Sequence, residues 1–299
     1  MLAAALASGA SGRPSGGTPI ALVTAETENE LLAVSLPPHR VLARVHVPAD
    51  PQNVAVLAGS AVVVVSTRSH AVTVLTPELK IVRIFRSFRT PHLAAIGSDG
   101  KHAYVTDDGK GSLVVVDLTR PAIVARIPVG LGAHHLAFSP GGNKLWIALG
   151  ERARAIVELD TSNPARPHVV GRFDPGFAAH DLGFGPDGRH VWVTSDSDAR
   201  VRVFSSLTHR LLFSVPVGPP PQHVAFGPRS EVYLTSGYGS RIVHVAEVPY
   251  GSFNVATAGG FVVTSSLLRG TVTELSSQLR VIATLKVAPA ARAVAVAVR

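Results

Sequence analysis

HHLAFSPGGNKLWIALG, residues 134–150, is the pattern on which this chain is built. Two histidines precede a short apolar run, Leu-Ala-Phe, which continues into a Ser-Pro-Gly-Gly turn, where glycine tolerates positive φ angles. A second apolar run follows, with an aromatic residue, Trp146, at its centre. Short apolar runs separated by such turn residues predict two antiparallel β-strands joined by a tight turn.

The same pattern recurs along the whole chain. Strong copies are PHLAAIGSDGKHAYVTD from Pro91, HDLGFGPDGRHVWVTSD from His180 and QHVAFGPRSEVYLTSG from Gln222. Weaker copies are QNVAVLAGSAVVVVSTR from Gln52 and FNVATAGGFVVTSS from Phe253. Equivalent residues of the second strands lie about 40 to 46 residues apart, which is the period of four-stranded β-propeller blades. The repeat therefore predicts an all-β propeller.

The number of blades follows from the second strands, of which the sequence contains seven, beginning with ALVTA (residues 21–25). The first copy lacks an inner strand, and the chain ends in a single strand, ARAVAVAVR (residues 291–299). We expect this strand to complete the N-terminal blade and close the ring, because closure removes exposed sheet edges. The repeat is shorter between Val232 and Val262, so one shortened blade is predicted at about residues 237–262.

Residues 18–299 are predicted to form this propeller as a single domain. Residues 1–17, MLAAALASGASGRPSGG, are apolar at first and then rich in Gly and Ser. They are interpreted as a disordered N-terminus or the remnant of a signal peptide.

Composition narrows the class of protein further. The chain has no cysteine, which excludes disulfides, thiolate metal sites and a cysteine nucleophile. Its apolar runs are shorter than the ~20 residues that a membrane-spanning helix needs. The net charge is +8, but the basic residues are scattered singly, which disfavours nucleic acid as a partner.

The phrases SPGGNKLWIAL, GPDGRHVWVTS and GSDGKHAYVTD resemble the YVTN-type repeats of the YncE-like propeller family. The resemblance covers nearly the whole chain from about Ile20 and implies a seven-bladed propeller, which we expect to be a monomer. It also implies a periplasmic, secreted or cell-envelope location, with the cytoplasm as the other expectation. It implies no particular activity, because one fold hosts many functions.

Residues just before each inner strand of a propeller meet at one mouth of the central channel, although they are far apart in sequence. Four consecutive blades have histidine there. The candidate ligand-binding residues are Asn53, His92, His134, His135, His180, Asp181, Gln222, His223 and Asn254. No catalytic motif accompanies them, so no catalytic residue is assigned.

Imidazole nitrogen is a preferred ligand of Zn²⁺ and Cu²⁺. His92, His135, His180 and His223 are therefore candidate ligands for zinc or copper. The alternative is that polar residues at these positions only satisfy backbone groups of the loops.

Three functions are compatible with these features. The preferred interpretation is a non-enzymatic binding or scaffold protein that holds a protein or small-molecule partner at the histidine-lined channel mouth. The first alternative is a metal-binding protein or a lactonase-like metal-dependent hydrolase that uses the same histidines. The second is a nucleic-acid-binding protein.

Overall fold

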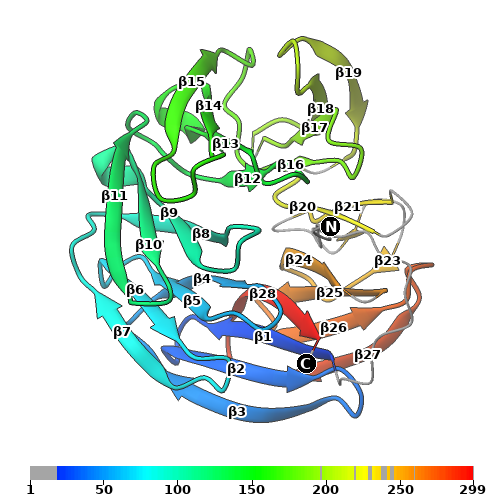
Figure 1. Cartoon of the computed structure of the whole chain (residues 1–299). Helices are drawn as coiled ribbons and strands as arrows, with labels where there is room; N and C mark the ends of the chain where they lie inside the picture. The colour runs from blue at the N-terminus through cyan, green and yellow to red at the C-terminus, as the bar shows by residue number, and fades with distance from the viewer. Residues whose placement is uncertain are drawn as a thin grey trace, which may run out of the picture.

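The computed structural model describes residues 19–195, 197–218, 220–227, 231–236, 241–242, 246–258 and 260–298. These residues form an all-β propeller, in which antiparallel sheets stand around a central channel (Figure 1). In each four-stranded sheet one edge strand lies next to the channel and the other lies at the rim (Figure 1). Residues 1–18 lie outside the described residues, so the interpretation of residues 1–17 stays a prediction.

Six sheets have four strands each. Three of them lie between residues 51 and 173: β4 (Pro51–Val56), β5 (Val62–Ser66), β6 (Ala71–Leu75) and β7 (Ile81–Phe85); β8 (Pro91–Ile96), β9 (His102–Asp107), β10 (Ser112–Asp117) and β11 (Ala122–Pro128); β12 (Leu136–Phe138), β13 (Lys144–Ala148), β14 (Ile156–Asp160) and β15 (His168–Phe173). Two follow from the second half: β16 (Leu182–Phe184), β17 (His190–Val193), β18 (Arg200–Ser205) and β19 (Leu211–Pro216); β24 (Ser252–Ala258), β25 (Phe261–Ser266), β26 (Thr271–Leu275) and β27 (Val281–Lys286).

The sixth four-stranded sheet joins the two ends of the chain. It consists of β28 (Ala291–Val298), β1 (Pro19–Ala25), β2 (Glu30–Ser35) and β3 (Arg40–His46). The inner strand β28 pairs antiparallel with β1, with Ile20 opposite Ala297 and Val23 opposite Val294. The predicted closure of the ring by the C-terminal strand is confirmed.

The remaining described strands form two smaller sheets. β20 (Val224–Phe226) pairs with β21 (Val232–Leu234), and β22 (Arg241–Ile242) pairs with β23 (Ala246–Glu247). The β20–β21 pair lies between the sheets that begin with β16 and β24 (Figure 1). The predicted range of the shortened blade, residues 237–262, is wrong at its C-terminal end, because β24 and β25 belong to a complete sheet. Residues 237–240, 243–245 and 259 of that range lie outside the described residues.

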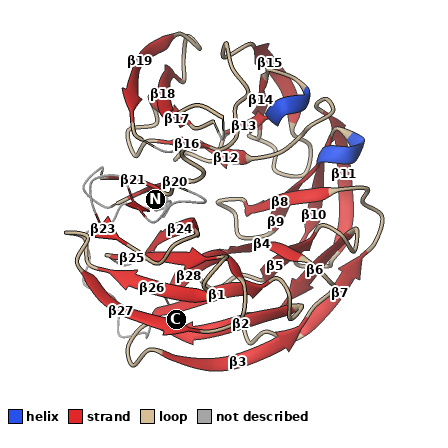
Figure 2. Cartoon of the chain, turned by 180° about the vertical axis from the view of Figure 1, so that it is seen from behind, coloured by secondary structure: helices blue, strands red, loops and turns tan. Residues whose placement is uncertain are grey.

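The described residues contain only short 3₁₀ helices, η1 (Asp108–Lys110) and η2 (Gly150–Arg152), which lie in loops between strands (Figure 2). Among these residues no helix is long and apolar enough to cross a membrane.

The core lies between neighbouring sheets rather than on one side of each. All five residues of β5, VVVVS, are buried, because the sheet is covered on both faces by other sheets. Val63 and Val72 of one sheet pack with Val105 and Val114 of the next. Rim strands instead alternate between exposed and half-buried residues, as β3 and β11 do, because only one of their faces meets a neighbour.

Buried threonine hydroxyls tie one sheet to the next beside the channel. Thr106 Oγ1 accepts a hydrogen bond from the N–H of Leu93 in its own sheet (3.0 Å) and donates one to the carbonyl of His134 in the following sheet (2.7 Å). The same two bonds are made by Thr194, with Asp181 N (3.0 Å) and Gln222 O (2.8 Å), and by Thr235, with His223 N (3.1 Å) and Phe253 O (2.8 Å). These bonds fix the chain where it enters each inner strand.

Replacing Thr194 with Val removes this hydroxyl while the side chain keeps its shape. The amide of Asp181 and the carbonyl of Gln222 then lose a partner in a buried place, which costs about 1–3 kcal/mol per group. We expect Thr194→Val to lower the free energy of unfolding in urea by an amount of this order. Thr208→Val, at an exposed turn, is the matched control. Equal unfolding midpoints for the two variants would contradict the role of the hydroxyl.

Candidate metal centre in the propeller channel

The candidate residues lie around one cavity of about 560 Å³ in the centre of the ring. They occupy two adjacent positions at the start of each inner strand. The first position holds Gln52, His92, His134, His180, Gln222, Phe253 and Arg292; the second holds Asn53, Leu93, His135, Asp181, His223, Asn254 and Ala293. All of these residues except Asp181 line the cavity.

The strand register shows how the repeat that contains His92 aligns with the repeats that contain His135 and His180. The N–H groups of Leu93, Asp181 and His223 all donate to the threonine of the paired strand, so these three residues are equivalent. His92 therefore shares the first position with His134 and His180, rather than the second position with His135. The strand pairing agrees, because Ala95 opposite Tyr104 corresponds to Ala137 opposite Trp146.

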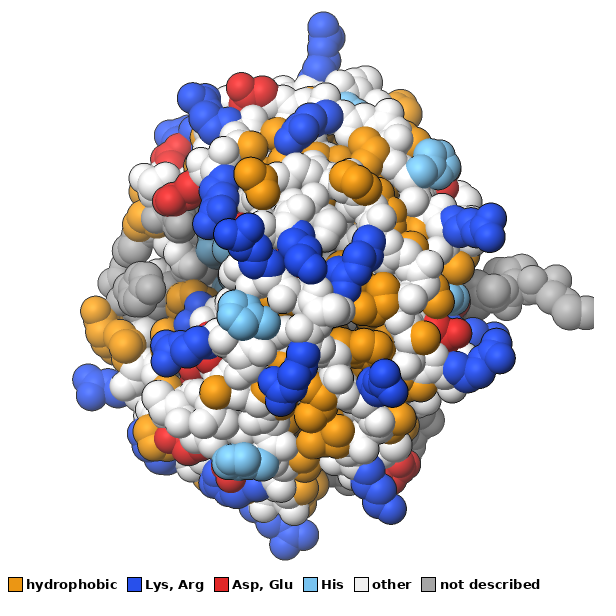
Figure 3. Space-filling model, turned by 90° about the vertical axis from the view of Figure 1, so that its left-hand side faces the viewer, with side chains coloured by type: hydrophobic (Ala, Val, Ile, Leu, Met, Phe, Trp, Pro, Cys, Tyr) orange, Lys and Arg blue, Asp and Glu red, His pale blue; other side chains and the backbone are white. Residues whose placement is uncertain are grey.

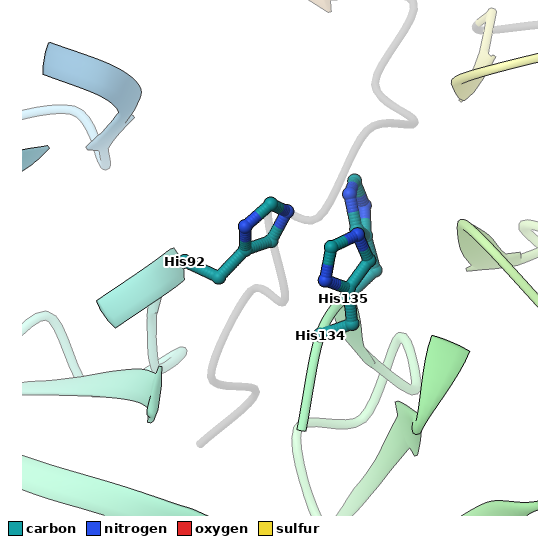
Figure 4. A group of neighbouring side chains, drawn as sticks. All are labelled: His92, His134 and His135. Carbon is teal, nitrogen blue, oxygen red and sulfur yellow. The ribbon is translucent and has the colours of Figure 1, made fainter. Parts of the chain in front are cut away.

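Five histidines form one continuous cluster of contacting rings. His92 stacks on His134 with a centroid distance of 3.6 Å, and Figure 4 shows it pointing toward both His134 and His135. His135 is central to the cluster: its ring centroid lies 4.9 Å from that of His134, 4.7 Å from that of His180 and 5.0 Å from that of His223. The sheets that begin with β8, β12, β16 and β20 thus bring their histidines together, as the repeat predicts.

Asp181 is the buried carboxylate that orients this cluster. Its Oδ1 accepts a hydrogen bond from Nδ1 of His135 at 2.8 Å, and its Oδ2 lies 3.3 Å from Nδ1 of His223. Oδ2 also accepts the N–H of Val224 at 3.0 Å. Because an ionised carboxylate only accepts hydrogen bonds, the facing Nδ1 atoms carry the protons. The Nε2 atoms of His135 and His223 are left with lone pairs.

The charges of the site follow from its burial. Burial lowers the pKa of His135 to about 4, although Asp181 acts in the opposite direction. Burial also lowers the pKa of His92 and of His180 well below 6.5, and neighbouring histidines add to the effect. Burial alone would raise the pKa of Asp181, but His135 and His223 hold it well below its usual value. At neutral pH these histidines are neutral, which is the form that binds metals.

Two groups of three histidines have ligand atoms close enough to share a metal ion. One group is His92, His134 and His135, and the other is His135, His180 and His223; within each, the nitrogens lie within 4.8 Å of one another. A tetrahedral zinc site with 2.0–2.1 Å bonds needs nitrogens about 3.4 Å apart, so small side-chain shifts would close either group around an ion. The predicted set of four is not one group: His92 joins His134 instead of His180 and His223.

The two asparagines of the candidate set make structural hydrogen bonds instead. Asn53 Oδ1 accepts the N–H of Ala94 in the next sheet at 3.0 Å, and Asn254 Oδ1 accepts that of Val294 at 3.3 Å. Asp181 makes the equivalent bond to Val224. The asparagine side chains thus bind backbone groups of the neighbouring inner strands, β8 and β28, rather than of loops.

Two residues near the histidine cluster are missing from the predicted site: Arg292, which lines the cavity, and Asp108, which lies outside it. Arg292 precedes most of β28, with Nη1 bound to Oε2 of Glu26 at 2.9 Å and its guanidinium carbon 4.9 Å from the ring centroid of Phe253. Asp108 lies behind the cluster, with Oδ2 3.6 Å from Nδ1 of His134. Arg292 could have been found from the sequence, because it occupies the repeat position of His92 and His134.

Acidification of the metal-free protein is expected to lower the free energy of unfolding. The pKa of His135 is about 4 in the folded protein and near 6.5 when unfolded, so the stabilisation is complete above pH 6.5 and is lost as the pH falls toward 4. His92 has the same sign. Each extra proton taken up on unfolding changes the free energy by about 1.4 kcal/mol per pH unit. We expect His92→Gln to make the dependence shallower by up to this amount between pH 6 and 4.5, measured by urea unfolding in the presence of a chelator.

The control for this measurement is His46→Gln, which changes an exposed histidine of the rim strand β3. A His92→Gln protein whose stability changes with pH as steeply as that of the control would contradict the neutral state of His92.

Neither a known protein family nor a curated protein sequence matches the chain. Solved structures do match: a protein of unknown function from Desulfotomaculum acetoxidans has a TM-score of 0.80 at 15% identity, covering 93% of this chain and 98% of that protein. Hydrazine synthase from Kuenenia stuttgartiensis has a TM-score of 0.76 at 18% identity, covering 87% of this chain and 92% of that protein. Apo AztD from Citrobacter koseri has a TM-score of 0.72 at 10% identity, covering 94% of this chain and 98% of that protein. At these identities the likeness shows the fold alone, which is a β-propeller.

Proposed function

We propose that this protein is a non-enzymatic binding protein that holds one divalent transition-metal ion, Zn²⁺ or Cu²⁺, among the channel histidines. The observation that supports this most strongly is the bridging position of Asp181 between His135 and His223. Histidines that bind metals almost always donate their second N–H to a carboxylate or carbonyl group, which fixes the ring and makes the ligand nitrogen more basic. Asp181 places two imidazoles in this state beside the cavity.

His135, His180 and His223 are the proposed ligands. Two of the three are oriented by the same carboxylate, whose negative charge would offset part of the charge of the ion. His135 and His223 are also almost fully buried, with 2% and 8% of their surface exposed, so little water would compete with the ligands. Neutral imidazole suits zinc and copper among the common divalent ions.

The binding of a single ion follows from the shared residue. His135 belongs to both groups of three histidines, and its Nδ1 is held by Asp181. Only its Nε2 is left to bind a metal, so the two groups cannot be filled at the same time with three ligands each. His92 and His134 are then neighbours of the ion rather than a second complete site.

The other proposals concern the class of protein. We propose that β20–β21 marks a seventh, shortened blade, which is supported by the seven inner-strand starts that meet at the cavity. We also propose that the protein is a YVTN-type propeller, that it is exported and that it is a monomer. A metal-dependent hydrolase would use the same ligands and would add turnover of a lactone or ester.

Nucleic-acid binding has less support. Figure 3 shows lysine and arginine side chains spread over one flank of the ring, with apolar side chains and some acidic ones between them. Rim strands expose apolar residues there and elsewhere, including Val82, which is 50% exposed, and Val124, which is 45% exposed. A groove that tracks phosphates would instead need a continuous basic path.

The proposal predicts that metal-free protein, purified without an affinity tag, takes up one equivalent of Zn²⁺. Asp181→Asn keeps the size of the side chain but removes its charge and its control of the His135 tautomer. We expect this variant to weaken zinc affinity by about 10- to 100-fold, as is typical when such a carboxylate is lost. His135→Gln should weaken it further. The measurements are metal analysis after dialysis and competition with a zinc-sensitive dye.

Asp99→Asn is the matched control. Asp99 also pairs with a histidine, its Oδ2 lying 2.6 Å from Nδ1 of His102, but the pair is remote from the channel mouth. Binding of neither zinc nor copper by the wild-type protein would overturn the proposal. Equal zinc affinities of the Asp181→Asn and Asp99→Asn variants would overturn the assignment of the ligands. Turnover of lactones or esters that needs the metal would favour the hydrolase.

A further inference from the structure

We propose that the cavity binds its metal ion together with a small organic anion, one carboxylate of which is held by Arg292 across the channel from the histidines. The inference rests on the proposed metal site and names the second ligand that this site takes. The anion would have two acidic groups, one for the open position on the metal and one for the guanidinium.

The size of the cavity is the first argument. Its volume of about 560 Å³ is far more than one metal ion fills, and it lies within the range of about 300–1,000 Å³ of small-molecule sites. Three imidazoles leave the fourth position of a tetrahedral zinc ion open toward this space. A ligand of the size of a short dicarboxylate can occupy it.

The position of Arg292 is the second argument. Figure 1 places β28, whose start carries Arg292, on the other side of the channel from β12 and β16. The guanidinium is held in place by two contacts, the 2.9 Å bond from Nη1 to Glu26 and the ring of Phe253. Its Nε and Nη2 have no hydrogen-bond partner among the described residues. An arginine fixed in this way presents the paired N–H groups that bind carboxylates in a bidentate manner.

Charge balance is the third argument. A bound divalent ion adds two positive charges, of which Asp181 offsets one, while Arg292 and Glu26 offset each other. No aspartate or glutamate is among the described residues that line the cavity, so its wall supplies no second negative charge. The ion therefore leaves an excess of one positive charge, which favours an anion in the cavity.

The test measures zinc affinity at buffered free zinc with and without succinate, and with the neutral diamide succinamide as the ligand control. If both ligands bind next to each other, each raises the affinity of the other by the same factor. We expect succinate to tighten zinc binding about tenfold, within the usual range of such coupling, and succinamide to have no effect.

Arg292→Gln should reduce the ratio of the two zinc affinities to about one. The matched control is Arg44→Gln, which breaks a similar ion pair, between Arg44 Nη1 and Glu30 Oε2 at 2.9 Å, on the rim of the same sheet. This control should keep the tenfold ratio. If Arg292→Gln is unstable because Glu26 is left unpaired, the double variant Glu26→Gln/Arg292→Gln takes its place, and Arg292→Lys should retain only part of the gain.

The outcomes separate the two proposals. Zinc binding that is equally tight with and without succinate overturns the anion site and leaves the metal site standing. A succinate effect that survives in Arg292→Gln or in the double variant overturns the role of Arg292. Absence of zinc and copper binding under all conditions overturns the metal site and the anion site with it.

Discussion

The hydrogen bonds of a buried threonine hydroxyl beside the channel hold the ring in register. In each of three sheets the hydroxyl accepts the amide of its own inner strand and donates to the carbonyl of the next sheet. A propeller has few covalent links between neighbouring sheets, and apolar packing between them is not directional. The hydroxyls supply the missing direction. They set the height at which each strand leaves the channel, and therefore where the residue just before it points.

The sheet that begins with β12 lacks this hydroxyl and carries part of the candidate site; the sheet that begins with β4 lacks it as well, with Val65 at this position. Ala148 stands where Thr194 and Thr235 stand in the following sheets. The carbonyl groups of these three residues accept the equivalent N–H groups, those of His134, His180 and Gln222. A methyl group cannot link this sheet to the next one. The link is made instead by His135 and Asp181, and Asp181 continues it to Val224. A contact between the side chains of His135 and Asp181 thus replaces the bond of the threonine hydroxyl and brings imidazoles and a carboxylate together.

The repeat made the propeller, the closing strand and the gathering of histidines predictable, because equivalent residues of a ring must meet near its axis. It could not predict which histidines share a metal ion. That depends on side-chain direction, which the repeat does not give. The shared position of His92 and His134 follows once the two repeats are aligned on Tyr104 and Trp146. The orienting role of Asp181 was also out of reach, since it needs the distance between two sheets. Arg292 carried a signal, its repeat position, but no histidine-based pattern included it.

Because β28 closes the ring, the cavity is complete only after the last strand of the chain has been synthesised. The histidine cluster comes from consecutive sheets in the middle of the chain, so its members can meet before the last strand exists. Arg292 lies in that last strand, whereas Glu26, to which it binds, follows β1 and is therefore synthesised early. The Arg292 side of the cavity therefore forms only when the ring closes. An unclosed ring can present its imidazoles, but only a closed one presents the guanidinium opposite them.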